Sequence, residues 1–137
     1  MWWTPEALLQ WAAGQAVAPQ YGLSIEEMRA NDLFRWLRGF GRSFGWRQTG
    51  TLTKLQTEVN QGAVGLIVAR RKEDGRSGHI VAVVPETEDW RARRDGDGEV
   101  VAPLQSQAGS TNFRRGTGKT RWWTGEEFAE FAFWLHA

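Results

Sequence analysis

Large apolar side chains recur at helical spacing in the first half of the chain. The clearest group is Leu33, Phe34, Trp36, Leu37 and Phe40. Spacings of three and four place such residues on one face of a helix, so the pattern predicts a helix over Ala30–Gly39. Leu52, Leu55 and Val59 predict a second helix over Thr51–Asn60 in the same way.

The apolar period changes after residue 62. Ala63–Arg70 and Gly78–Pro85 are short runs rich in β-branched residues, and a polar, glycine-bearing segment between them suits a hairpin turn. Glu99–Gln107 predicts a third strand. Pro103 within it lacks a backbone N–H, so we expect that strand to lie at an edge or to carry a bulge.

The two ends of the chain add further helical and strand signals. Residues Thr4–Ala13 predict a short helix, and Ser24–Glu27 could cap another. Near the C-terminus, Thr124 and Glu127 form a capping-box pattern for a helical turn. The alternation of Phe131, Phe133 and Leu135 then suits a strand.

Helices followed by an antiparallel sheet predict an α+β fold. The length of 137 residues suits one domain over residues 1–137, in which residues 1–23 form an N-terminal helical extension. No apolar run approaches the roughly 18 residues of a membrane span, and no basic-then-apolar N-terminus suggests a secretory signal.

Composition narrows the possible chemistry. The chain has no cysteine, which removes disulfides, cysteine–zinc sites and a thiol nucleophile. Its two histidines, His79 and His136, lie far apart in sequence, so we expect no metal site and no cofactor. The net charge of +1 argues against wholesale phosphate neutralisation and hence against a nucleic-acid partner, although arginines cluster in two regions.

His79 opens an apolar strand directly after Gly78, which carries no side chain and lets another group approach closely. The histidine could be a core residue or a base held at a strand end. The segment GHIVAVV resembles the histidine strand of the papain-like NlpC/P60 and CHAP peptidoglycan hydrolases. The resemblance covers roughly residues 24–107 and rests mainly on the order and spacing of its elements.

The resemblance implies a catalytic triad in which a cysteine at the start of a helix attacks the substrate. In this chain the corresponding position is Ala30, in the segment ANDLF. His79 would be the base, and Gln105 or Gln107 on the next strand would orient its ring. Both glutamines could instead be exposed edge-strand residues. Backbone N–H groups near Ala30 and Asn31 would form the oxyanion hole.

The same resemblance implies a cysteine peptidase or amidase that cuts peptidoglycan stem peptides, with Ala30 in place of the nucleophile. The chain as written is then inactive, whether the alanine is engineered or native. Candidate residues for lining the substrate groove are Asn31, Trp46, Trp90, Trp122 and Trp123.

The context expected from the resemblance is an antibacterial effector of the type VI secretion kind. It would be a monomer secreted without a signal peptide, would act in the periplasm of a target cell, and would meet an immunity protein and a secretion-apparatus carrier. Two alternatives remain open. One is a non-catalytic module that binds a glycan or peptide on the same scaffold, and the other is a basic domain that binds nucleic acid or a partner protein.

Overall fold

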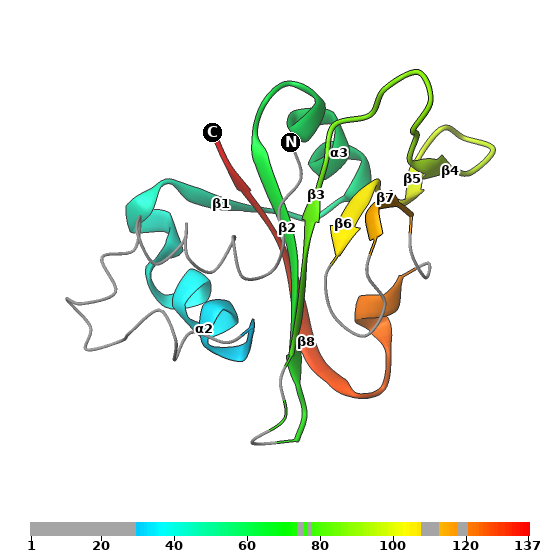
Figure 1. The fold of residues 1–137 in the computed structure, drawn as a ribbon. Coiled ribbons are helices and arrows are strands. Elements are labelled where there is room, and N and C mark those ends of the chain that lie inside the picture. Colours follow the sequence, from blue (N-terminus) through cyan, green and yellow to red (C-terminus); the bar gives the residue numbers. More distant parts are fainter. Residues whose placement is uncertain (1–29, 74–75, 77, 108–112, 118–120) are drawn as a thin grey trace.

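An antiparallel sheet forms the centre of the molecule (Figure 1). The computed structural model describes residues 30–73, 76, 78–107, 113–117 and 121–137. In spatial order, the sheet strands are β1 (Trp46–Thr49), β8 (Phe128–His136), β2 (Val64–Arg71), β3 (His79–Val83), β6 (Gln105–Gln107) and β7 (Phe113–Gly116). A separate two-stranded ribbon joins β4 (Arg93–Arg94) to β5 (Val100–Ala102).

Two helices cover opposite faces of this sheet, as Figure 1 shows. They are α2 (Ala30–Phe40) and α3 (Leu52–Asn60). Alternate residues of β2 divide between them, because side chains along a strand point to opposite faces. Leu66 and Val68 pack in the cluster that contains α2, whereas Ile67 and Ala69 pack in the cluster that contains α3. We call these two sides the α2 face and the α3 face.

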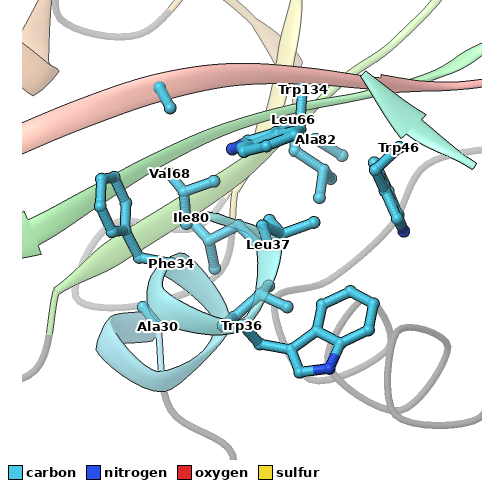
Figure 2. Packing of buried hydrophobic residues seen from close by; sticks show 12 residues of the cluster. Ala30, Phe34, Trp36, Leu37, Trp46, Leu66, Val68, Ile80, Ala82 and Trp134 are labelled. Carbon is cyan, nitrogen blue, oxygen red and sulfur yellow. The ribbon is translucent and has the colours of Figure 1, made fainter. Parts of the chain in front are cut away.

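The α2 face is filled by the residues whose spacing predicts the helix (Figure 2). Leu33 and Leu37 are fully buried against the sheet, where Trp134 of β8 and Trp46 of β1 also lie. Arg35 and Arg38 remain exposed on the other side of the helix. The short 3₁₀ helix η3 (Gly41–Phe44) follows, and Gly45, at φ 91°, then leads the chain into β1.

The α3 face depends on a close approach between helix and sheet. The Thr51 side chain caps α3 by accepting a hydrogen bond from the Lys54 backbone N–H at 3.1 Å. Leu55 and Val59 then lie directly over Gly65 of β2. A Cβ atom at Gly65 would stand 2.5 Å from Val59 Cγ2, so the missing side chain lets the helix reach the sheet.

The structure confirms the α+β class and the main elements expected from the sequence. The predicted helices Ala30–Gly39 and Thr51–Asn60 correspond to α2 and α3. The predicted strands Ala63–Arg70 and Gly78–Pro85 correspond to β2 and β3. The alternating C-terminal residues form β8, which lies inside the sheet between β1 and β2.

Other expectations need correction. The single strand predicted over Glu99–Gln107 is wrong, because the chain forms β5 and β6 in two different sheets. Pro103 separates them and cannot donate to a ladder, while the next N–H, of Leu104, donates to the Gln56 side chain at 2.8 Å. The turn expected at Thr124–Glu127 begins earlier, as the 3₁₀ helix η4 (Trp122–Thr124). The sequence pattern did not predict β1, β4 or β7.

The predicted elements Thr4–Ala13 and Ser24–Glu27, with the extension over residues 1–23, lie outside the described residues. Within the described part of the chain, no helix is long and apolar enough to cross a membrane.

Candidate functional site

Ala30 begins α2 on the α2 face, in the buried cluster that also contains Phe34 and Ile80 (Figure 2). Its side chain is 8% exposed. The next residue, Asn31, fastens the helix start to the β2–β3 hairpin. Its Nδ2 donates to the Arg76 carbonyl at 2.7 Å, and its Oδ1 accepts from the Arg71 N–H at 3.0 Å. Asn31 therefore has a structural role at the beginning of α2.

Gly78 provides the close approach that the sequence suggested. A Cβ atom there would collide with the Ala69 carbonyl oxygen of β2 and with Asn31 Oδ1. The absent side chain lets the start of α2 sit directly beside the residue that precedes His79.

His79 itself points to the α3 face. It pairs with Ala69 across the β2–β3 ladder, and Ala69 belongs to the α3-face cluster, whereas the following residue, Ile80, belongs to the α2-face cluster. The His79 ring lies edge-on to the Trp122 indole, with 4.7 Å between ring centroids and 82° between planes. The half-buried histidine therefore meets η4.

Gln105 lies on the same face, opposite Val83, and is fully buried. Its Oε1 accepts from Trp122 Nε1 at 2.9 Å, and its Nε2 donates to the carbonyls of Thr117 at 2.9 Å and Pro103 at 3.2 Å. The amide is thus used to hold the Trp122 indole. Gln107 pairs with Phe113, and its side chain lies outside the described part of the structure.

The structure brings His79 and Gln105 to one indole, but it does not bring Ala30 to either of them. The expected convergence of position 30, His79 and an orienting glutamine is therefore not found in this arrangement. The reason is strand alternation: α2 packs on the side of Ile80, so the adjacent His79 points through to the other face. The Trp122 side chain stands where the sequence placed a direct His79–glutamine contact.

The tryptophans expected to line a groove differ in position and exposure. Trp46 is 1% exposed in the α2-face core, so its predicted place in a groove is wrong. Trp90 is 45% exposed, on the segment after β3. Trp122 is half-buried between His79 and Gln105, and Trp123 beside it is buried. Burial of the large apolar surface of an indole is favourable, which explains why Trp46 and Trp123 lie in the core.

A cavity of about 310 Å³ opens on the α3 face beyond Trp123. It lies where α3, β5, η4 and β8 meet. Three aromatic side chains form its apolar wall: Trp123, Phe131 and Phe133. Polar groups at its rim come from Thr53, Glu99 and Arg121. We call this the α3-face pocket. The sequence pattern assigned Phe131 and Phe133 only to a strand, and so it missed them as site residues.

The rim of the α3-face pocket carries opposite charges. Arg121 is exposed, and among the described residues no ion pair engages its guanidinium. Its backbone adopts φ 54°, a left-handed conformation that is uncommon for a residue with a side chain. The exposed Glu99 carboxylate accepts a hydrogen bond from the Thr53 hydroxyl. The pocket can therefore hold an apolar group between an anion-binding and a cation-binding side chain.

A series of edge-on aromatic contacts connects His79 to this pocket. Trp122 contacts Trp123 at 5.7 Å between centroids, and Trp123 contacts Phe133 at 5.5 Å, both edge-on. His79, Trp122 and the α3-face pocket thus belong to one continuous aromatic layer. Such edge-to-face pairs favour a fixed arrangement of the rings.

Comparison with protein-family models, with curated proteins and with solved structures finds no match to the chain. Across the described residues, no group of three or more histidine and acidic side chains is placed to hold a metal ion.

Proposed function

We propose that the chain is a non-catalytic module that binds a peptide in the α3-face pocket. The scaffold is proposed to be of the papain-like NlpC/P60 type, in keeping with the sequence resemblance. On that basis the ligand is the stem peptide of peptidoglycan, held without being cut.

Three features of the proposed triad favour binding over cleavage. Alanine at position 30 offers no nucleophile, and it packs on the face opposite His79. The Gln105 amide donates to two backbone carbonyls and accepts from the Trp122 indole, which stands between it and His79. Nucleophilic catalysis requires the nucleophile and its base within hydrogen-bond reach. The placement of position 30 and His79 on opposite faces of the sheet favours the binding module on this ground.

The observation that carries the proposal is the combination of aromatic wall and opposite charges in one pocket. Trp123 and Phe131 offer apolar area, Arg121 can pair with a carboxylate, and Glu99 can accept from an ammonium group. A stem peptide with a diamino acid has both charged groups beside aliphatic chain. Small-ligand sites have this general form, with mostly apolar walls and a few polar groups that fix orientation.

Calorimetric titration with a soluble stem tetrapeptide tests the proposal. We expect saturable binding that weakens by about 5- to 20-fold in Arg121→Gln and in Glu99→Gln, because each change removes a charge-assisted hydrogen bond worth roughly 1–2 kcal/mol. Arg91→Gln is the matched control, since this exposed arginine does not line the pocket. Absence of binding, or equal loss in all three variants, would overturn the proposal.

A second candidate function is the cysteine peptidase or amidase itself, in a parent that carries cysteine at position 30. The observation that favours it is the position of Asn31, which fixes the start of α2 beside Gly78, next to His79 in the chain. A thiolate there would gain from the helix N-terminus. The effector context belongs to this candidate: type VI delivery to a target periplasm, and an immunity protein.

Ala30→Cys separates the two candidates. With His79 on the opposite face, we expect this variant to release no amines from purified sacculi. Ala132→Cys is the matched control, because Ala132 is equally buried, at 8% exposure, in the same cluster. Amine release by Ala30→Cys alone, abolished by adding His79→Ala, would establish the peptidase and reject the binding module.

A further inference from the structure

The buried Gln105 side chain holds the Trp122 indole from inside the sheet. Its Oε1 accepts from Trp122 Nε1 at 2.9 Å, while its Nε2 donates to the carbonyls of Thr117 and Pro103. An indole N–H only donates and a carbonyl only accepts, so these partners fix the amide in one orientation. The residue lies on β6 between β3 and β7 and does not itself line the α3-face pocket.

The distinctive contribution of this hydrogen bond is its direction. Burial of a polar amide is costly unless the amide is bonded, and an apolar pair of the same shape can be nearly as stable. A polar network whose members are all satisfied instead specifies one arrangement of the groups around it. The bond from Trp122 Nε1 to Gln105 therefore fixes where the indole lies.

Trp122 stands between two residues of the pocket. Arg121 before it and Trp123 after it both line the α3-face pocket, whereas Trp122 does not. The Arg121 carbonyl accepts from the Thr124 N–H at 3.0 Å and from the Thr124 hydroxyl at 2.7 Å. These bonds hold the three residues in one turn, so the position of Trp122 also sets the positions of Arg121 and Trp123.

Ring contacts connect Trp122 to the pocket wall as well. The Trp122 indole lies edge-on to Trp123, with 84° between the ring planes, and edge-on to His79, with 82°. A displaced Trp122 would thus shift the wall directly. A ligand would then have to order the wall as it binds, and that ordering lowers affinity.

We propose that Gln105 is a positioning residue of the α3-face pocket. By holding Trp122 Nε1 it fixes η4, so that the Arg121 cation and the Trp123 wall are in place before the ligand arrives. His79 packs on the same indole and supports it. This inference rests on the stem-peptide binding proposed above, and it gives the residue expected to orient a catalytic histidine a role in binding.

Calorimetric titration of Gln105→Met with the soluble stem tetrapeptide tests this role. Gln56→Met is the matched control, because Gln56 is equally buried and its amide also makes three hydrogen bonds, with Leu104, Val84 and Asn60, but it lies outside the pocket. Both changes should lower the melting temperature. Only Gln105→Met should weaken peptide binding, by at least 5-fold.

Trp122→Phe removes the same hydrogen bond from the other side, since phenylalanine keeps a ring but has no N–H. It should also weaken binding at least 5-fold, and it tests the inference even where Gln105→Met does not fold. Adding Gln105→Met to Trp122→Phe should change the affinity less than 2-fold, because the bond is already absent.

Three results would overturn the positioning role alone, provided that the unchanged protein binds the peptide. They are full affinity in Gln105→Met or in Trp122→Phe, equal losses in Gln105→Met and Gln56→Met, and independent, additive effects of the two changes in the double variant. Absence of binding by the unchanged protein would overturn the stem-peptide function and this inference with it.

Discussion

Glu86 shows how one side chain fixes the loop between β3 and β4. Its carboxylate is nearly buried and accepts from the Arg94 guanidinium at 2.7 and 2.8 Å, from Asn60 Nδ2 at 3.0 Å and from the Ala92 N–H at 2.8 Å. These hydrogen bonds, led by that from Arg94 and opposed by burial, lower the pKa of Glu86 from 4.5 to about 2. The loop is thereby tied to the end of α3.

The lowered pKa predicts how stability depends on pH. Because the folded state holds the ionised form of Glu86, its contribution is present above pH 4.5 and is lost as pH falls toward 2. The contribution is on the order of 3 kcal/mol. Glu86→Gln should remove much of this stabilisation near pH 7 and make the free energy of unfolding depend less on pH between about 2 and 4.5. Urea unfolding at several pH values measures both effects, and parallel pH profiles for the two proteins would contradict the prediction.

At the scale of elements, the contact between α3 and β2 depends on a missing side chain. Val59 Cγ2 and Leu55 Cδ1 lie 2.5 and 3.1 Å from the position that a Cβ atom would take at Gly65. The backbone of β2 is held there between β3 and β8 and has little room to move. Gly65 therefore sets how closely the helix lies on the sheet.

Gly65→Ala should lower the free energy of unfolding by about 1–3 kcal/mol, since overpacking in a core forces the helix to shift. Gly50→Ala is the control, because a Cβ atom there would meet nothing within 4 Å. Chemical denaturation compares the two variants. Equal stability of Gly65→Ala and the unchanged protein would show that α3 does not rest on this glycine.

Elements built from local patterns could be read from the sequence, and those set by distant contacts could not. The spacing of apolar residues alone predicts the helix that contains Leu33 and Leu37 and the strand that contains Phe131 and Phe133. Pro103 predicted an edge strand or a bulge. The chain instead divides there into β5 and β6, and the next N–H, that of Leu104, donates to Gln56 of α3, a contact that no local pattern shows. The strand over Trp46–Thr49 is too short for a period and forms by pairing with β8.

At the scale of the whole molecule, two helices on opposite faces decide which side chains meet. The sequence correctly placed Gln105 on the strand beside His79, and both share a face. It could not tell that α2 covers the other face, because the face a helix covers is set by packing across the sheet and not by residue order. For the same reason no local sequence pattern predicted the α3-face pocket, because its lining residues, such as Glu99 and Arg121, come from segments that are distant in sequence.

Nuclear magnetic resonance can observe the indole N–H groups of the tryptophans while a soluble stem peptide is added. We predict that the signals of Trp123 and Trp122 shift in a saturable way, because these rings form the wall of the α3-face pocket and its neighbouring layer. Those of Trp36 and Trp134, buried on the α2 face, should stay in place. Shifts confined to the α2-face tryptophans, or no shift at any of them, would contradict binding on the α3 face.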